Sequence, residues 1–172
     1  MVEINVAQFL KSPLGTTRTY EIDEPIRIGD DDPVVRGAVT FLRTNRGILV
    51  TGRLQTSVEL TCSRCLSQHR QPLTLKIEEE FFPTIDILTG GEASVPEDEP
   101  EAFTIDQNNI LDLSEAIRQY ALLTAPMKPL CREDCQGLCP TCGANLNVKT
   151  CDCPPQTDLR TRGLAVGKVN EP

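Results

Sequence analysis

Eight cysteines carry most of the chemistry that this 172-residue sequence can support. Two of them, Cys62 and Cys65, form a Cys-x2-Cys pair, and six crowd into one later stretch: Cys131, Cys135, Cys139, Cys142, Cys151 and Cys153. Tight bends that each present two sulfurs are typical of tetrahedral thiolate sites. Zinc accepts four thiolates without an electronic penalty, and four sulfurs leave no open position for catalysis. We therefore predict two structural zinc ions.

The spacing of the cysteines allows two ways of grouping them. In the first, Cys62 and Cys65 join Cys131 and Cys135, while the last four cysteines close a short local loop at small entropic cost. In the second, the two Cys-x2-Cys pairs share one ion as in a zinc ribbon, and the other ion takes Cys131, Cys135, Cys151 and Cys153. We favour the first grouping because its local loop is short.

The ends and composition of the sequence favour reduced cysteines. The first residues lack a basic start followed by an apolar core, and no apolar run approaches the length of a membrane span. We therefore expect a cytoplasmic protein without membrane association. In that compartment clustered thiols indicate metal binding first, with a disulfide framework as the alternative.

Few other residues could support catalysis. No Ser–His–acid set, glycine-rich phosphate loop or paired-carboxylate site is evident. The sole histidine, His69, lies four residues beyond Cys65 and is interpreted as a surface residue or as a hydrogen-bond donor beside the cysteines, with ligation as the alternative. We therefore predict that the protein is not an enzyme and has no small-molecule substrate.

Alternating hydrophobic residues predict the strands that position the first cysteine pair. Apolar and polar residues alternate from Ile48 to Thr61, which is typical of a half-buried antiparallel strand. A similar alternation runs from Leu73 to Phe81, so the first cysteine pair is predicted to lie at the tip of a β-hairpin. Two earlier strands are predicted over residues 16–22 and 34–43, with a hairpin turn over 44–47.

A helix is predicted between the strands and the six-cysteine segment. Asp112 or Ser114 can cap its start, Glu115 suits its first turn, and Pro126 ends it. Its apolar residues recur at helical spacing, and we expect them to pack against the sheet: Leu113, Ile117, Tyr120 and Leu123.

These elements define an α+β fold class, with a small antiparallel β-sheet (hairpin or meander) packed by one main helix, and a C-terminal Cys-rich zinc module. The sheet and helix are predicted to occupy residues 1–126. They include an acidic loop over 84–104, which we expect to be mobile because it is rich in Gly, Pro and Glu. The zinc module is predicted over 127–153, and a tail over 154–172.

The net charge of −8 is unevenly distributed. Residues 77–117 contain twelve acids and no Lys or Arg, whereas residues 33–76 contain seven bases and one acid. Such polarity within one small chain is informative about partners rather than about fold. On the outward parity of the predicted sheet, three bases are candidates for contact with RNA phosphates, with a solvated surface as the alternative: Arg36, Arg53 and Lys76.

Three of these segments resemble the YceD family, whose members are described as large ribosomal RNA subunit accumulation proteins. The resemblance rests on the hairpin end 58–66, the helix 111–124 and the string CREDCQGLCPTCGANLN at 131–147, and it covers most of the chain. It implies a role in making or stabilising large-subunit ribosomal RNA, with no catalytic residues assigned. The tail at 157–164 departs from the family pattern because it is less basic than expected.

The resemblance and the residues together predict a ribosome-biogenesis factor with structural zinc sites. Its expected partners are the large-subunit ribosomal RNA precursor, ribosomal proteins, or both. One alternative is a zinc-stabilised chaperone or adaptor whose acidic segment binds a basic ribosomal protein. Another is an rRNA-processing enzyme, for which the sequence offers no nucleophile, base or open metal position.

Overall fold

The computed structural model describes residues 2–87, 89–93 and 102–154. The chain forms two compact units. One contains the chain up to Leu60 together with His69–Pro129, and the other contains Thr61–Gln68 together with the chain from Leu130 onward. The loop that carries the first cysteine pair therefore belongs with the cysteine-rich segment, although the two are far apart in the sequence.

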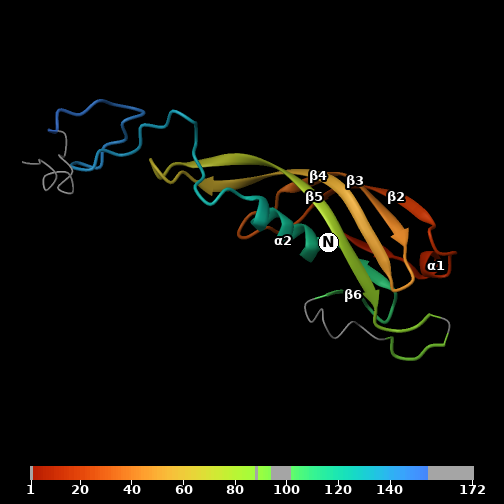
Figure 1. Cartoon of the computed structure of the whole chain (residues 1–172). Helices are drawn as coiled ribbons and strands as arrows, with labels where there is room; N and C mark the ends of the chain where they lie inside the picture. Colours follow the sequence, from red (N-terminus) through yellow and green to blue (C-terminus); the bar gives the residue numbers. More distant parts are fainter. Residues whose placement is uncertain (1, 88, 94–101, 155–172) are drawn as a thin grey trace, which may run out of the picture. The chain divides into compact units, whose positions relative to one another are not determined.

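The first unit is built on a five-stranded sheet with the order β2-β3-β4-β5-β6 (Figure 1). The strands β2 to β5 follow one another as neighbours, as a meander does. Their bounds are Thr17–Pro25 for β2, Val34–Arg43 for β3, Ile48–Thr61 for β4, Gln68–Pro83 for β5 and Phe103–Ile105 for β6.

The last strand makes the sheet mixed rather than purely antiparallel. β6 pairs in parallel with the end of β5, with Phe103 beside Phe81 and Ile105 beside Pro83. The rings of the two phenylalanines stack with their centroids 5.3 Å apart. The prediction of an antiparallel sheet is therefore wrong at this edge, because the chain after β5 returns to lie alongside the strand it has just left.

The alternation that predicted β4 is confirmed by its burial. Ile48, Val50, Leu54 and Val58 are buried, whereas Arg53 is exposed. The buried side chains join one hydrophobic core with apolar residues of β2, β3, β5 and the helix α2. The predicted turn is also present, since the Thr44 amide donates to the Gly47 carbonyl at 3.1 Å.

The helix α2, Ser114–Thr124, covers one face of this sheet (Figure 1). The predicted cap is present in part: Asp112 accepts the Ser114 amide at 2.8 Å, whereas the Ser114 hydroxyl accepts the amide of Val2 at 2.9 Å. Leu113 and Ile117 are buried as expected, and Tyr120 is partly buried.

One residue of the predicted apolar stripe is not in the core. Leu123 is 82% exposed. The buried contact of α2 is made by Ala116, Ile117 and Ala121, whose small alanine side chains let the helix approach the sheet closely. That contact ends at Ala121, before the last turn of the helix, so Leu123 lies beyond it.

Three further elements escaped the sequence analysis. A two-stranded antiparallel sheet joins β1, Glu3–Asn5, to β7, Ile110–Asp112, and a one-turn helix, α1, spans Ala7–Leu10. The start of the predicted acidic loop is also ordered, because the Asp86 amide donates to the Gly91 carbonyl at 2.8 Å. Residues 94–101 of that loop and residues 155–172 of the predicted tail lie outside the described residues. No helix in the described part of the chain is long and apolar enough to cross a bilayer.

The close approach of the 44–47 turn to β5 gives the first testable prediction. A Cβ atom at Gly47 would lie 2.0 Å from the Phe81 carbonyl oxygen, which is main chain and cannot move alone. We expect Gly47→Ala to reduce the free energy of unfolding by roughly 1–3 kcal/mol, as overpacking usually does. Urea denaturation measures this change.

Gly91→Ala is the matched control, since the nearest atom to its Cβ would be the Thr89 hydroxyl at 3.6 Å. We expect that variant to unfold close to the wild-type midpoint. Equal stability of the two variants would contradict the steric role given to Gly47.

Candidate metal centres

The described cysteines form two groups of four within the second unit. Cys62 and Cys65 lie with Cys131 and Cys135, and the other group contains Cys139, Cys142, Cys151 and Cys153. Within each group the four sulfur atoms lie within 4.8 Å of one another. The structure thus brings the sulfurs together in the first of the two predicted groupings, and the zinc-ribbon grouping is not formed.

The two Cys-x2-Cys turns share one backbone conformation. In the first turn, the Leu66 amide donates to the Cys62 carbonyl at 3.0 Å, and the Cys62 amide donates to the Ser67 carbonyl at 2.9 Å. In the second, the Gly143 amide donates to the Cys139 carbonyl at 2.8 Å, and the Cys139 amide donates to the Ala144 carbonyl at 2.8 Å.

The residue after each turn adopts the left-handed conformation that such a turn requires. Gly143 has a φ of 70°, which glycine adopts at no steric cost. Leu66 has a φ of 58°, which is rare for a residue with a branched side chain. A leucine in this conformation indicates that the surrounding contacts hold the first turn firmly in shape.

The first group has the geometry of a tetrahedral thiolate site. A metal–sulfur bond of about 2.3 Å places tetrahedral sulfurs about 3.8 Å apart. The sulfur of Cys62 lies 3.8 Å from that of Cys135, and the sulfur of Cys65 lies 3.6 Å from that of Cys131. Three of the four cysteines are buried, and Cys131 is half-buried. The residues present therefore fit a divalent ion that prefers sulfur.

Side chains around the first group fix the two segments that supply its sulfurs. The guanidinium of Arg64 donates to the Cys135 carbonyl at 2.9 Å, and the Leu138 amide donates to the Arg64 carbonyl at 3.1 Å. Gly137 passes close to the same carbonyl, where a Cβ atom would lie 3.1 Å from the oxygen. The loop between β4 and β5 is thus bonded directly to the segment after Cys135.

Asn147 contributes to the first group although sequence reasoning assigned it no role. Its amide nitrogen donates to the Cys135 sulfur at 3.3 Å. Its amide oxygen accepts from the Gln136 amide at 2.8 Å and from Arg132 at 2.7 Å. Such a donor stabilises a thiolate and holds its direction. Asn147 is the last residue of the segment 131–147 that resembles the YceD family, and this position was the only sequence feature that could have indicated a role for it.

The electrostatics of the first group separate the pKa values of its thiols, because those of Cys62 and Cys65 are lowered and that of Cys131 is raised. Burial by itself would raise the pKa of Cys62, but hydrogen bonds from Cys131, Cys65 and Arg64 outweigh it and lower that pKa. Burial raises the pKa of Cys131, and hydrogen bonding to the Cys65 thiol raises it further. Four negative sulfurs this close repel one another, so a divalent cation is needed for all four to lose their protons.

The second group repeats this pattern. Hydrogen bonds from the main chain of Cys142 and Thr141 lower the pKa of Cys139, whereas hydrogen bonding to the Cys142 thiol raises the pKa of Cys153. Cys139 is buried, Cys142 is exposed, and the other two cysteines are half-buried. The second group is thus the more accessible of the two.

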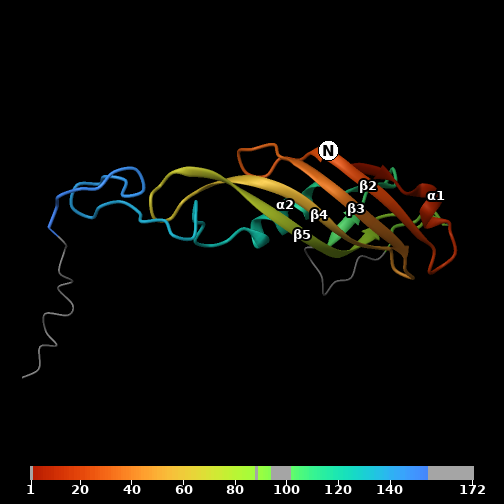
Figure 2. The same ribbon diagram turned by 90° about the horizontal axis from the view of Figure 1, so that it is seen from above.

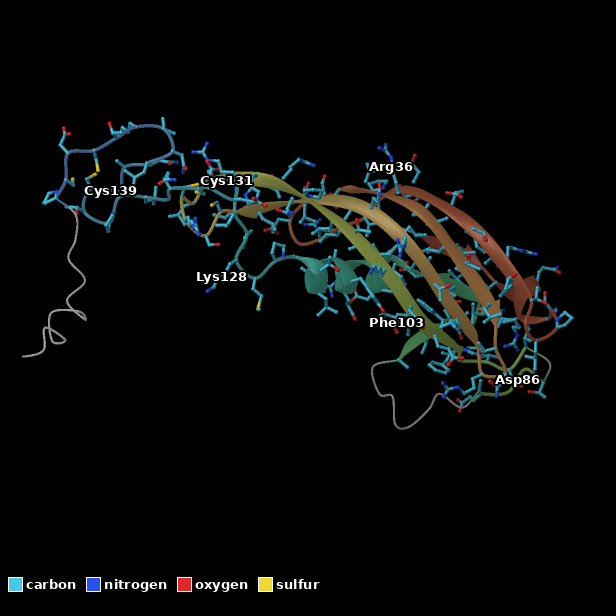
Figure 3. All side chains as sticks on the ribbon, turned by 45° about the horizontal axis from the view of Figure 1, so that its top comes forward. Arg36, Asp86, Phe103, Lys128, Cys131 and Cys139 are labelled. Carbon is cyan, nitrogen blue, oxygen red and sulfur yellow. The ribbon has the colours of Figure 1, made fainter. Side chains whose placement is uncertain are left out.

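The other residues singled out from the sequence lie in the first unit. His69 belongs to neither group of metal-ligating side chains in the described chain. Arg36, Arg53 and Lys76 are all exposed. Arg36 pairs in register with Gln55, so it lies on the same sheet face as Arg53, away from α2 (Figure 3).

One of these bases already has an acidic partner. The Arg36 guanidinium donates to Asp23 at 2.9 Å, in an ion pair whose side chains are both about two-thirds exposed. In the described part of the chain, Arg53 and Lys76 form no ion pair within 4.0 Å. Ion pairs this exposed are weak, so Arg36 can exchange its partner for another anion at small cost.

The sequence matches the profile of one protein family and the sequences of several known proteins. The sequence profile of a family described as "Large ribosomal RNA subunit accumulation protein YceD" matches residues 50–166, which contain all eight cysteines. An uncharacterized protein of Mycobacterium tuberculosis is 34% identical over 150 residues, which cover 83% of this chain and 70% of that protein.

A plant protein also matches. The "Large ribosomal RNA subunit accumulation protein YCED homolog 1, chloroplastic" of Arabidopsis thaliana is 27% identical over 143 residues, which cover 72% of this chain and 44% of the plant protein. No solved structure gives a significant match.

Because the two cysteine groups share no residue, they predict how many metal ions each chain binds. We expect the wild-type protein to carry two ions per chain and Cys139→Ser to carry one, because that change removes a ligand from the second group only. Mass-spectrometric metal analysis of the purified protein gives the count, with Thr141→Ala in the same turn as control. Loss of both ions from Cys139→Ser would contradict separate sites.

The hydrogen bond from Asn147 to the Cys135 sulfur predicts an effect of Asn147 on metal affinity. The Cys139→Ser variant lacks the second site, so its metal affinity is that of the first group alone. In this variant we expect the further change Asn147→Ala to weaken metal affinity roughly 10- to 100-fold, as loss of a ligand's supporting hydrogen bond usually does. Competition with a chromophoric chelator measures the affinity. Val148→Ala is the control, since Val148 is 81% exposed. Unchanged affinity in Asn147→Ala would show that the hydrogen bond does not support the site.

Proposed function

Because the chain belongs to the YceD family of large ribosomal RNA subunit accumulation proteins, we propose that it is a non-enzymatic ribosome-biogenesis factor for the large subunit. The family match over residues 50–166 is the observation that carries the proposal. In this role the protein promotes accumulation or processing of large-subunit ribosomal RNA through binding. Its partners are the ribosomal RNA precursor, ribosomal proteins, or both, and it acts in the cytoplasm.

We propose zinc as the ion in both cysteine groups. Eight thiols in two sets of four match the soft, tetrahedral coordination that zinc accepts, and the 3.6–3.8 Å sulfur separations of the first set agree with zinc–sulfur bond lengths. Four sulfurs fill the coordination shell of such an ion. The ions would therefore hold the second unit in shape and leave no position for a substrate or an attacking water.

The RNA contact proposed here uses the exposed sheet face that carries Arg36, Arg53 and Lys76. Arg36 and Arg53 lie on neighbouring strands, and Lys76 lies on the exposed parity of β5. Bases on a rigid sheet can contact phosphates without first losing much conformational freedom. The same face carries acids, including Asp23, so the contact is local rather than a uniformly basic surface.

The alternative proposal is a zinc-stabilised chaperone or adaptor for a basic ribosomal protein. The acid-rich stretch at 77–117 supports it, since Glu78 and Glu80 lie on the exposed parity of β5. In that version the sheet bases are dispensable for association. An rRNA-processing enzyme is the third possibility, and specific cleavage of precursor rRNA by the pure protein with magnesium would establish it in place of the proposal.

Purification of the tagged protein from its own cells at moderate salt tests the function directly. We expect precursor rRNA of the large subunit to be enriched over mature rRNA, and sequencing of the bound RNA measures this. RNase treatment before elution separates RNA contact from protein contact. Absence of both ribosomal RNA and ribosomal proteins would overturn the proposal.

Neutralising Arg36, Arg53 and Lys76 distinguishes association through RNA from association through a basic ribosomal protein. We expect the triple variant Arg36→Gln, Arg53→Gln, Lys76→Gln to lose RNA association and to reduce the salt dependence of binding by about one unit of slope per lost phosphate contact. The matched control removes the same charge from other exposed bases: Lys11→Gln, Arg27→Gln and Lys128→Gln. Intact association in the first triple variant would favour the chaperone version.

A further inference from the structure

The strand β2 is the outermost strand of the five-stranded sheet (Figure 2). It is nine residues long, and in the described part of the chain no strand pairs with its far edge. Soluble proteins usually keep such edges short or cover them, because unpaired main-chain groups can accept another strand. An unpaired edge of this length is therefore a candidate position for an added strand.

The register of β2 shows which main-chain groups face outward. At its two ends, the Arg43 amide donates to the Thr16 carbonyl at 2.9 Å, and the Ile26 amide donates to the Pro33 carbonyl at 3.0 Å. Between them the register is unbroken, and bonded and non-bonded pairs alternate in an antiparallel ladder. The even-numbered residues therefore bond to β3, and the odd-numbered ones direct their amides and carbonyls outward: Thr17, Thr19, Glu21 and Asp23.

A second strand edge borders the same space. The strand β1 bonds to β7 through its even-numbered residues, since the Leu113 amide donates to the Val2 carbonyl at 2.9 Å and the Val6 amide donates to the Asn109 carbonyl at 2.9 Å. The main-chain groups of Glu3 therefore face away from β7. A cavity of about 350 Å³ lies between the two strands and is lined by Val2, Glu3, Ile4 and the β2 residues 20–24. We call this cavity the β1–β2 groove.

The charge of the β1–β2 groove selects its occupant. Its lining contains four acids and no base: Glu3, Glu21, Asp23 and Glu24. Asp23 forms an ion pair with Arg36, and the lining remains acidic through Glu3 and Glu21. Two copies of β2 paired edge to edge in the antiparallel register centred on Glu21 would place Glu21 opposite Glu21, and like charges directly opposite destabilise a sheet. A basic segment is attracted by the same residues.

Apolar side chains in the lining define the pattern of the occupant. Val2 and Ile22 are buried, and Ile4 and Tyr20 pack partly against the core. Successive side chains of an added strand point to opposite faces, so apolar residues can meet these side chains while basic residues meet the carboxylates. The groove thus fits an extended segment in which basic and apolar residues alternate.

We infer that the β1–β2 groove binds an extended basic peptide segment of a partner protein as an added strand on β2. The outward amides and carbonyls of Thr19, Glu21 and Asp23 supply the hydrogen bonds, and the acids supply the preference for basic sequence. Such binding does not require contact with ribosomal RNA, although the groove adjoins the proposed RNA contact where Asp23 pairs with Arg36.

Amide hydrogen exchange followed by NMR tests the inference on the full-length, metal-loaded protein. The probe is a ten-residue peptide of alternating lysine and valine with blocked ends. We expect saturating peptide to slow exchange at least tenfold at the outward amides of Thr17, Thr19, Glu21 and Asp23. The amides of the intervening residues already bond to β3 and should change little.

The same peptide with alternate amides N-methylated keeps its charge but cannot form the ladder, and we expect it to give no protection. Protection that is uniform along β2, or equal for the methylated peptide, would show adhesion by charge alone and overturn the inference. Protection of the outward amides without any peptide would point to a second copy or to another segment of this chain, and would also overturn it.

Two substitutions of Thr19 separate the contribution of its main-chain amide to peptide binding from that of its side chain. Thr19→Pro removes one outward amide and leaves the bonds to β3 intact, since proline is tolerated at a strand edge. Both Thr19→Pro and Thr19→Ala lose the hydroxyl, which lies 3.2 Å from that of Thr40. We expect Thr19→Pro to bind the peptide at least tenfold more weakly than Thr19→Ala. Equal affinities would contradict strand addition.

Discussion

Four thiols gathered in one small space are the constraint on which the second unit depends. Among the described residues, its buried cluster contains Cys62, Cys65 and Cys135, with Leu130, Cys131 and Leu138 packed against them. So little apolar surface cannot offset the entropy of ordering two segments that are distant in the sequence. The proposed metal ligation would be strong enough to do so, because the binding free energy of a structural ion becomes folding free energy.

The first unit has the opposite character. Its core runs through the sheet, α1 and α2 and buries large side chains such as Phe9, Phe41 and Phe81. With the proposed ions bound, the two units should respond differently to a chelator, since both cysteine groups lie in the second unit. The bonds that Arg64 makes to the Cys135 and Leu138 main chains explain why the loop between β4 and β5 belongs to the metal unit.

Local patterns predicted the parts of the structure that depend on local physics. The bounds of β4 follow from alternation, and the start of α2 follows from Asp112, because strand burial and helix capping involve neighbours in the sequence. The grouping of the cysteines was favoured by loop entropy, which is also a property of spacing. Each of these features could be derived before any tertiary contact was known.

Features that depend on distant residues could not be derived in this way. The parallel pairing of β6 depends on where a long loop returns, and the short strand β1 is defined only by its partner β7. Leu123 has the helical spacing of a core residue, yet its burial depends on how far the sheet extends beneath α2. Asn147 becomes a hydrogen-bond donor to Cys135 only once the chain has folded around the first group.

The charge of the metal unit decides which surface is available to phosphate. A divalent ion with four thiolates carries a formal charge of −2, so each occupied group would repel an RNA backbone. The bases nearest these groups are partly committed, since Arg64 bonds to the Cys135 carbonyl and Arg132 bonds to Asn147 and Asp134. Among the three sheet bases of the first unit, Arg36 has the weak ion pair with Asp23, and in the described residues Arg53 and Lys76 form no ion pair within 4.0 Å. These charges therefore favour the sheet bases over the metal unit for the proposed RNA contact, and the proposed ions would serve the fold of the metal unit.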